Sequence, residues 1–317
     1  MLPSVLLIGI GFVLLYGGGE ALVRGAGALA LRMGMSPFIV GMTIVAFATS
    51  SPELAVSVLA AARGADDVAI GNVVGSNICN IGLILGLAAL IRPAEVHLRI
   101  LRMDIPWLIF VSALLVAFLQ DGRISRPAGI VFLLGLGVFL YWNIQLARRE
   151  RDEELVRREF EDVVRAPQAG PGLLWVLIGG GLAALVGGGH AFVQGGVGLA
   201  TALGVSPALI SLTVVAFGTS LPDLATTLVA TLRREDDIAV GNIIGSNFFN
   251  ILAILGLTAT FHPLERGGIT LVDLYSMLAF TVVLLPLVLA RQRIGRRGGA
   301  VLLAGYLAYL GWLASQA

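Results

Sequence analysis

Long apolar stretches dominate the chain and constrain its fold more than any other feature. About ten segments are long enough to cross a membrane, since a spanning helix needs roughly 20 apolar residues. Charged residues make up 13% of the 317 residues, whereas a water-soluble domain normally carries about 25%. The apolar runs are continuous, so helices are expected and not a barrel. The expected spans are 4–31, 36–62, 68–90, 104–119, 127–147, 172–202, 206–231, 238–260, 269–290 and 298–315.

An internal repeat with a constant spacing divides the chain into two halves. The segment GMTIVAFATSSPELAVSVLA at 41–60 is matched by SLTVVAFGTSLPDLATTLVA at 211–230. The segment DDVAIGNVVGSNICNIGL at 66–83 is matched by DDIAVGNIIGSNFFNILA at 236–253, at the same spacing and without a gap. The spacing is 170 residues in both cases, and residues 170 positions apart are called counterparts below.

The number of spans in each half determines how the halves enter the membrane. Each half holds five expected spans, an odd number, so the second half must enter from the opposite side. Inverted repeats of this kind are typical of secondary transporters, with the site near the bilayer midplane.

The predicted fold class is therefore an all-α membrane protein of ten transmembrane helices in two inverted five-helix repeats. The expected boundaries are a first repeat at 1–147, a linker loop at 148–170 and an inverted second repeat at 171–317. Arginine-rich connections lie in the cytoplasm by the positive-inside rule. Four arginines fall on the face with both termini and sixteen on the face with the linker. We expect a cell (inner or plasma) membrane protein with both termini outside and the linker in the cytoplasm.

Glu53 and Asp223 are the only acidic residues well inside the second and seventh expected spans, 36–62 and 206–231. An ionisable group at this depth is costly and marks a functional site by default. Arg24 is the one arginine inside an expected span, and Glu20, one helical turn away, is its expected partner. Arg24 is therefore not assigned to either carboxylate, and we expect Glu53 and Asp223 to bind cations.

Hydroxyl and amide side chains accompany both carboxylates at helical spacing. Thr49 and Ser50 precede Glu53 by four and three residues, so the three are expected on one helix face. Pro52 cannot donate a backbone hydrogen bond, and a proline in a span is tolerated where freed carbonyls meet a polar cavity. The carbonyls near Ala46 and Ala216 can also tilt inward. The side chains expected to donate oxygen are those of Thr49, Ser50, Glu53, Ser76, Asn80, Thr219, Ser220, Asp223, Ser246 and Asn250.

The chemistry of these donors restricts the cation. Oxygen ligands without histidine or cysteine favour Ca²⁺, Na⁺ or Mg²⁺ over zinc or copper. Ca²⁺ accepts about six to eight oxygens in flexible geometry, whereas Mg²⁺ demands a tight octahedron, so a large mixed cage favours Ca²⁺ and Na⁺. Two carboxylates are neutralised by one Ca²⁺ or two Na⁺. Exchange of more than two Na⁺ for one Ca²⁺ would move net charge through the membrane field and be electrogenic.

At these residues the sequence resembles the cation/calcium exchanger superfamily, in particular the prokaryotic sodium/calcium exchangers. The T-S-x-P-[ED] and G-N-x-x-G-S-N-x-x-N motifs look like that family's paired alpha repeats. The resemblance implies a core of spans 2, 3, 7 and 8, with spans 1 and 6 sliding across it to switch access. Asn250, where some members carry Asp, implies independence from K⁺. The ion ligands that it implies are Ala46, Thr49, Ser50, Glu53, Ser76, Asn80, Ala216, Thr219, Ser220, Asp223, Ser246 and Asn250.

The expected function is exchange of Na⁺ for Ca²⁺ by alternating access, and H⁺/Ca²⁺ antiport by the same carboxylates stays open as an alternative. A cation channel usually builds its filter around an oligomer axis, whereas one chain here supplies all expected ligands. An intramembrane protease with two carboxylates fits less well, because these lie among symmetric neutral oxygens with no catalytic histidine nearby. We expect Ca²⁺ and Na⁺ as substrates in a lipid bilayer, with no enzymatic activity, cofactor, nucleic-acid partner or obligate protein partner.

Overall fold

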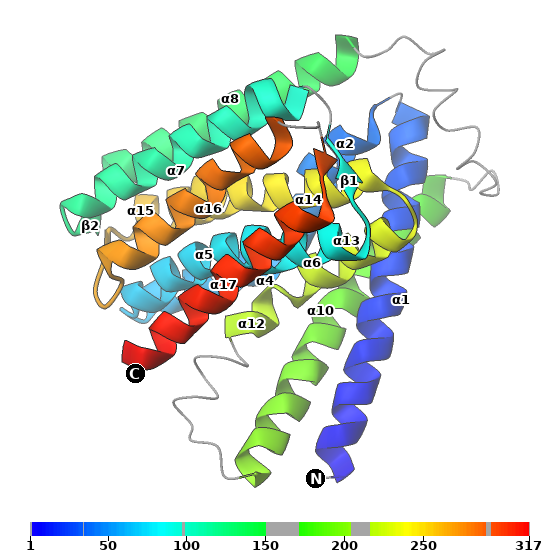
Figure 1. Ribbon diagram of the computed structural model, residues 1–317, viewed down its shortest axis with the longest axis horizontal. Coiled ribbons are helices and arrows are strands. Elements are labelled where there is room, and N and C mark those ends of the chain that lie inside the picture. Colours follow the sequence, from blue (N-terminus) through cyan, green and yellow to red (C-terminus); the bar gives the residue numbers. More distant parts are fainter. Residues whose placement is uncertain are drawn as a thin grey trace. The chain divides into compact units, whose positions relative to one another are not determined.

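The computed structural model describes residues 2–33, 35–96, 99–149, 171–203, 216–289 and 293–316, and these are almost entirely helical (Figure 1). Within the described ranges, eight helices are long and apolar enough to cross a membrane. The segments Pro37–Thr49 and Ser51–Ala62 pass the same test only together and are bent by 44° at their break, as in a broken span or a re-entrant loop. The prediction of a span at 206–231 falls partly outside the described residues, and its described end is an apolar helix, Leu221–Leu232.

Most helices run without interruption, but several contain a π-helical segment, labelled η. The elements of the first half are α1 (Leu2–Met33), α2 (Pro37–Val40), η1 (Gly41–Val45), α3 (Ala46–Thr49), α4 (Ser51–Ala62), α5 (Asp66–Cys79), η2 (Asn80–Leu85), α6 (Gly86–Ile91), β1 (Ala94–Glu95), η3 (Ile100–Asp104), α7 (Ile105–Gln120), β2 (Arg123–Ile124) and α8 (Arg126–Arg149). Those of the second half are α10 (Pro171–Ala202), α12 (Ala216–Thr219), α13 (Leu221–Leu232), α14 (Asp236–Phe248), η5 (Phe249–Leu255), α15 (Gly256–Phe261), β3 (Leu264–Glu265), α16 (Leu271–Leu289), β4 (Arg293–Ile294) and α17 (Arg296–Gln316).

The chain packs into two compact units, and each takes segments from both halves of the sequence. Unit 1 comprises Met1–Thr49 with Trp142–Asn242, and unit 2 comprises Ser50–Tyr141 with Ile243–Ala317. The units describe which segments pack together, whereas the expected boundaries at 147 and 171 describe a repeat in the sequence. The repeat boundaries therefore stay a prediction.

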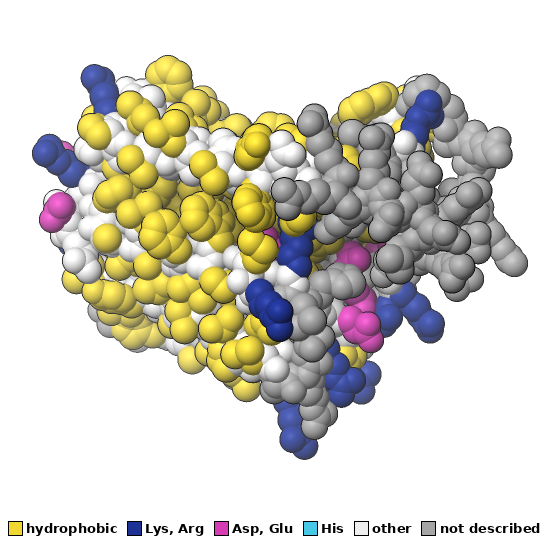
Figure 2. All heavy atoms as spheres, turned by 90° about the horizontal axis from the view of Figure 1, so that it is seen from above, with side chains coloured by type: hydrophobic (Ala, Val, Ile, Leu, Met, Phe, Trp, Pro, Cys, Tyr) yellow, Lys and Arg dark blue, Asp and Glu magenta, His cyan; other side chains and the backbone are white. Residues whose placement is uncertain are grey.

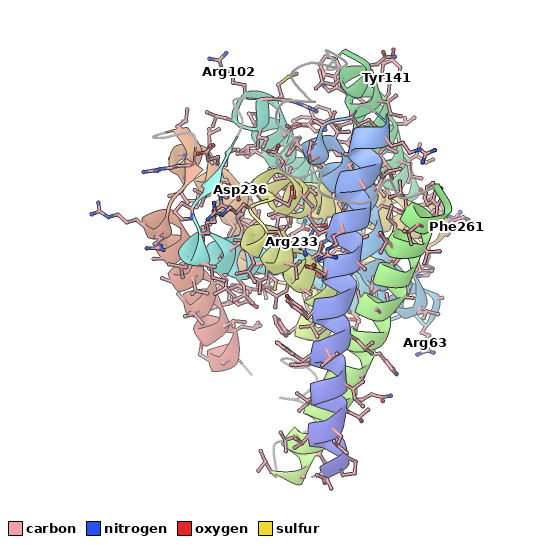
Figure 3. The ribbon with its side chains drawn as sticks, turned by 90° about the vertical axis from the view of Figure 1, so that its right-hand side faces the viewer. Arg63, Arg102, Tyr141, Arg233, Asp236 and Phe261 are labelled. Atoms are coloured by element: carbon pink, nitrogen blue, oxygen red, sulfur yellow. The ribbon has the colours of Figure 1, made fainter. Side chains whose placement is uncertain are left out.

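In unit 1 the long helices α1 and α10 lie side by side and approach each other at glycines (Figures 1 and 3). A Cβ on Gly18 would lie 2.8 Å from the carbonyl oxygen of Gly181, and one on Gly11 would lie 2.8 Å from that of Gly188. Such contacts are too short for any side chain, so only glycine lets the two backbones come this close. The pairing is crossed, because Gly181 is the counterpart of Gly11, and Gly188 that of Gly18.

Unit 2 shows the same crossed pattern in two short antiparallel strand pairs. β1 pairs with β4, and Ala94 lies opposite Ile294. β2 pairs with β3, and Ile124 lies opposite Leu264. Leu264 is the counterpart of Ala94, and Ile294 that of Ile124, so each strand pairs with the counterpart of the other. A two-fold relation between two copies produces this exchange of partners.

The outer surface of the described residues is apolar over wide areas (Figure 2). Large side chains such as Phe12, Leu134 and Trp175 have more than 60% of their surface exposed. An apolar exterior of this extent is typical of a surface that faces lipid or a partner. Together with the apolar helices, which satisfy their own backbone hydrogen bonds, it makes the chain an all-helical membrane protein.

The close approach of α1 and α10 generates a stability prediction. We expect Gly18→Ala to destabilise the protein by about 1–3 kcal/mol, because the new methyl group overpacks against the α10 backbone. Gly17→Ala is the matched control, since a Cβ at Gly17 would meet nothing within 4 Å. The measurement is the midpoint of thermal unfolding in detergent. Equal midpoints for the two variants would show that the helices are not in close contact.

Candidate cation-binding site

Two helix breaks with the same backbone geometry lie at matching positions of the repeat. α3 and α4 are separated by Ser50 alone, and α12 and α13 by Ser220 alone. Ser50 has φ −83° and ψ 3°, and Ser220 has φ −85° and ψ 3°. These angles fall in the sparsely populated bridge region, where many active-site residues lie. The breaks are therefore a specific feature that both halves share.

Pro52 explains the first break and corrects one expectation. Helical spacing predicted a continuous helix through Thr49, Ser50 and Glu53, but α3 ends at Thr49. Pro52 is at the start of α4, and without an N–H it cannot continue the hydrogen bonds of the preceding turn. The N–H of Leu54 donates instead to the carbonyl of Ser50 at 3.1 Å, which starts the new helix. Thr49 therefore ends one helix, and Ser50 and Glu53 lie at the start of the next, so the three residues do not share the face of a single helix.

Glu53 and Asp223 lie in the first turns of α4 and α13. A carboxylate in this position is stabilised by unpaired backbone N–H groups and by the positive end of the helix dipole. Ser50 and Ser220 occupy the N-cap positions, three residues before each carboxylate, which is the spacing of a capping box. Neither serine makes a side-chain capping hydrogen bond. The serines and carboxylates thus gather at helix starts without using the serine hydroxyls as caps.

Burial of the predicted ligands supports a polar site inside the protein. Of those whose side chains the structure describes, Thr219 is half-buried and all the others are buried. Ala216 begins α12. Asn80 is fully buried, and neither its amide oxygen nor its amide nitrogen has a hydrogen-bond partner among the described residues. Buried polar groups in native structures nearly always have a partner, so the amide of Asn80 is placed as a ligand would be.

Asn80 and its counterpart Asn250 both lie in π-helical segments. Asn80 begins η2, and Asn250 is the second residue of η5. Short π-helical segments occur often at functional sites. The amide nitrogen of Asn250 donates to the amide oxygen of Asn77 at 3.0 Å. This hydrogen bond fixes which way the Asn250 amide points, and its oxygen accepts no hydrogen bond from the described part of the chain.

In unit 1 one asparagine connects predicted ligands from both halves. Asn242 on α14 donates from Nδ2 to Oδ1 of Asp223 and to Oγ1 of Thr227, both at 3.2 Å. Its Oδ1 accepts a hydrogen bond from the hydroxyl of Thr49 at 3.0 Å. All four side chains are completely inaccessible to solvent. The structure thus brings Thr49 and Asp223 together through Asn242.

In unit 2 the counterpart of this residue is Asn72. Its Nδ2 donates to the backbone carbonyl of Glu53 at 3.1 Å and to Oγ of Ser57 at 3.0 Å. The hydroxyl of Ser57 donates to the carbonyl of Ala69 at 3.3 Å. In both halves an asparagine therefore fastens the helix after the break to the next helix. The acceptor differs, because Asn72 binds the Glu53 backbone whereas Asn242 binds a carboxylate.

Sequence reasoning missed Asn72 and Asn242, together with their hydroxyl partners Ser57 and Thr227. All four are polar residues that lie inside apolar spans and have a polar counterpart in the other half. That criterion is the one that selected the carboxylates, so applying it to every repeated polar pair would have found them. This criterion does not reveal whether such a residue binds the ion itself or holds in place another residue that binds the ion.

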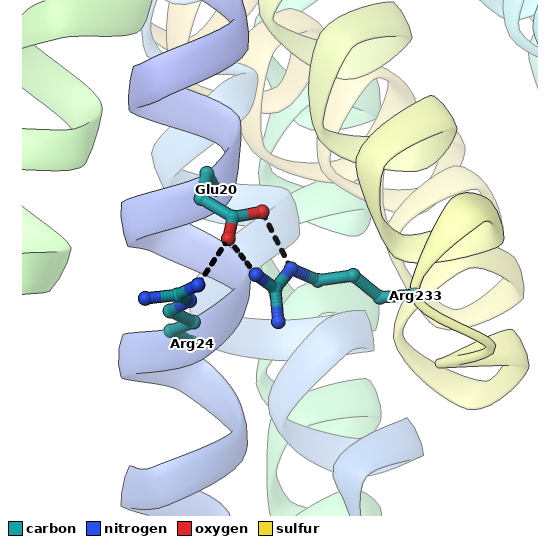
Figure 4. A network of polar contacts seen from close by, with 3 residues as sticks. All are labelled: Glu20, Arg24 and Arg233. Atoms are coloured by element: carbon teal, nitrogen blue, oxygen red, sulfur yellow. Dashed lines mark hydrogen bonds and ion pairs between the residues drawn. The ribbon is translucent and has the colours of Figure 1, made fainter. Parts of the chain in front are cut away.

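The predicted pair of Glu20 and Arg24 is confirmed, and a second arginine joins it (Figure 4). Arg24 Nη2 lies 2.7 Å from Glu20 Oε1. Arg233, at the C-cap of α13, also binds both oxygens of Glu20 through Nε and Nη2. Glu20 is thus the counter-charge of two arginines.

The donor set fits a hard cation. It consists of carboxylate, hydroxyl, amide and backbone oxygens, which are the ligands of Ca²⁺ and Na⁺. The described residues contain no group of three or more His, Cys, Asp or Glu that could hold a metal. A site built from these donors therefore relies on neutral oxygens around few carboxylates. Buried carboxylates at broken helices inside apolar spans are characteristic of membrane-embedded ion transporters.

A comparison with known protein families agrees with this class. The model of the family described as sodium/calcium exchanger protein matches residues 3–145 and again residues 173–314, once in each half. The chain belongs to the sodium/calcium exchanger protein family. The family predicted from the two motifs is therefore confirmed.

Individual relatives extend over nearly the whole chain. The putative antiporter CaxA of Alkalimonas amylolytica is 38% identical and covers 98% of both chains. The sodium/calcium exchanger MaX1 of Methanosarcina acetivorans is 33% identical and covers 97% of both. The solved structure of the sodium-calcium exchanger NCX_Mj matches with a TM-score of 0.83 and 31% identity, over 97% of both chains. This likeness confirms an all-helical membrane fold.

The buried carboxylates generate a binding prediction. Ca²⁺ at about 100 times its dissociation constant should stabilise the wild type by about 2.7 kcal/mol, which is measured as a rise in the thermal unfolding midpoint. Glu53→Gln should lose this rise, because a neutral amide replaces the charge that binds the cation. Glu95→Gln is the control, since Glu95 is the exposed residue of the two-residue strand β1. An undiminished rise in Glu53→Gln would remove Glu53 from the ligand set.

Proposed function

We propose that the protein is a secondary active transporter that exchanges Na⁺ for Ca²⁺ across the membrane by alternating access. The observation that carries this proposal is the pair of buried carboxylates, Glu53 and Asp223, each in the first turn after a matching helix break. Family membership and the likeness to the exchangers MaX1 and NCX_Mj support it. The protein acts as a transporter and not as an enzyme, and Ca²⁺ and Na⁺ are its substrates.

The proposed ion ligands combine the two helix breaks with the helices that follow them. The carboxylates carry the charge, and hydroxyl, amide and carbonyl oxygens complete the shell, as Ca²⁺ requires. Na⁺ and Ca²⁺ compete for the same carboxylates, so binding of one ion excludes the other. The proposed set is Ala46, Thr49, Ser50, Glu53, Ser76, Asn80, Ala216, Thr219, Ser220, Asp223, Ser246 and Asn250.

The proposed exchange is electrogenic and independent of K⁺. Each half contributes one carboxylate and a neutral asparagine, Asn80 or Asn250, so Na⁺ beyond two per Ca²⁺ adds net positive charge to the transport cycle. Such charge movement is driven by about 2.3 kcal/mol per charge per 100 mV. An inside-positive potential imposed on Na⁺-loaded vesicles should therefore accelerate Ca²⁺ uptake, with or without K⁺.

The proposed topology has ten spans in two inverted repeats, at 1–147 and 171–317, joined by the linker at 148–170. The crossed pairing of α1 with α10, and of the four strands, supports it because an in-plane two-fold axis relates inverted repeats. Both termini lie outside a cell (inner or plasma) membrane, and the linker, most of which lies outside the described residues, is cytoplasmic. Labelling of single cysteines at Leu2 and Gln316, in a protein whose buried Cys79 is replaced by Ala, tests this orientation from either side of the membrane.

The decisive functional test is Ca²⁺ uptake into vesicles that contain the purified protein. With Na⁺ inside and none outside, the outward Na⁺ gradient should drive Ca²⁺ uptake. Glu53→Gln should reduce uptake to the level of empty vesicles, whereas Glu95→Gln should transport like the wild type. Uptake driven by a pH gradient alone would support H⁺/Ca²⁺ exchange instead. Uptake that needs no counter-ion would contradict exchange altogether.

A further inference from the structure

The two halves hold their carboxylates in different ways, although the sequence motifs around them match. Asn72 reaches the backbone carbonyl of Glu53, whereas Asn242 reaches the carboxylate of Asp223 itself. Aspartate is one methylene shorter than glutamate, so its carboxylate lies closer to its own helix backbone. The amide that contacts the backbone in one half can therefore contact the side chain in the other.

Every polar group of Asn242 is engaged by a neighbouring side chain. Its Nδ2 carries two N–H donors, and these serve Asp223 and Thr227, while its Oδ1 accepts from Thr49. An amide nitrogen cannot bind a cation, and one of the two lone pairs of the amide oxygen accepts the Thr49 hydroxyl. Asn242 is thus arranged to hold ligands and not to act as one.

The hydroxyl of Thr49 shows what the oxygen of Asn242 contributes. This hydroxyl has one hydrogen and lies within reach of three acceptors: the carbonyls of Val45 at 3.0 Å and Ala46 at 3.2 Å, and Oδ1 of Asn242 at 3.0 Å. Donation to Asn242 leaves the Ala46 carbonyl and the lone pairs of Thr49 for a cation. Asn242 therefore contacts two predicted ligands at once, Thr49 and Asp223.

We propose that Asn242 is a positioning residue that couples Asp223 to Thr49 and so sets the affinity of the site for Ca²⁺. The inference rests on the proposed function, in which Asp223 and Thr49 bind the transported ion. Groups that hold metal ligands in place typically change metal affinity by about 10–100-fold when they are removed. The amide nitrogen of Asn72 donates instead to the backbone carbonyl of Glu53 and to the hydroxyl of Ser57.

The test compares the same substitution at the two equivalent asparagines. Asn242→Ala should raise the KM for Ca²⁺ and the Ca²⁺ dissociation constant by about 10–100-fold while the maximal rate stays close to that of the wild type. Asn72→Ala should raise both constants less than Asn242→Ala does, because its amide nitrogen donates to the backbone of Glu53 and not to a carboxylate. Equal changes in the two variants, or a loss of maximal rate alone in Asn242→Ala, would overturn the proposal.

A second comparison separates positioning from general damage to the fold. Asp223→Glu gives the second half the carboxylate of the first, which extends beyond the amide of Asn242. In that background Asn242→Ala should weaken Ca²⁺ binding less than it does in the wild type, and a full effect there would also contradict the proposal. If Asn242→Ala does not fold, Thr227→Val and Thr227→Ser replace it in the test, because Thr227 accepts a hydrogen bond from Asn242. Thr227→Val, which removes one anchor of Asn242, should weaken Ca²⁺ binding more than Thr227→Ser, and equal affinities would count against positioning.

Binding and flux distinguish a failure of this inference from a failure of the proposed function. Ca²⁺ binding to purified protein needs no Na⁺ gradient, so it can be compared between variants even if Na⁺ drives no uptake. A wild type that does not bind Ca²⁺ would refute the proposed function. A wild type that binds Ca²⁺, with Asn242→Ala and Asn72→Ala equally affected, would refute only the role of Asn242.

Discussion

The structure depends on the cost of placing carboxylates among apolar membrane helices. A charged group at mid-membrane costs several kcal/mol unless polar partners or an ion surround it. Here each carboxylate lies at the start of a helix that begins after a break, where free N–H groups and the helix dipole favour negative charge. The breaks follow from Pro52 and its counterpart Pro222, which cannot continue a helix. Two short sequence motifs thus supply both the charge and the backbone that tolerates it.

The second organising feature is the crossed pairing of equivalent segments. In unit 1 it appears at the glycines of α1 and α10, and in unit 2 at the paired strands. Two further glycine contacts follow the same rule, Gly86 with Gly299 and Gly129 with Gly256. These pairs join segments far apart in the sequence, so they can form only when both halves are present. The halves are nevertheless not identical at the site, because Asn242 contacts a carboxylate and Asn72 a backbone carbonyl.

Local patterns in the sequence predicted much of this architecture. Apolar length predicted the spans that the structure describes, and one-turn spacing predicted the pair of Glu20 and Arg24. Contacts between distant segments were not predictable, because periodicity reports only on neighbours along one helix. The second partner of Glu20, Arg233, is 213 residues away, and Thr49 and Asn242 are 193 residues apart. Helical spacing also misjudged the segment around Ser50, since proline ends the helix there.

The account requires that Na⁺ and Ca²⁺ compete for the same buried carboxylates. The most direct measurement is equilibrium binding of Ca²⁺ to the purified protein at increasing Na⁺ concentration. Na⁺ should displace Ca²⁺ with a Hill coefficient above one, because more than one Na⁺ is needed to balance one Ca²⁺. Ca²⁺ binding that does not respond to Na⁺, with choline as the ionic-strength control, would contradict the account.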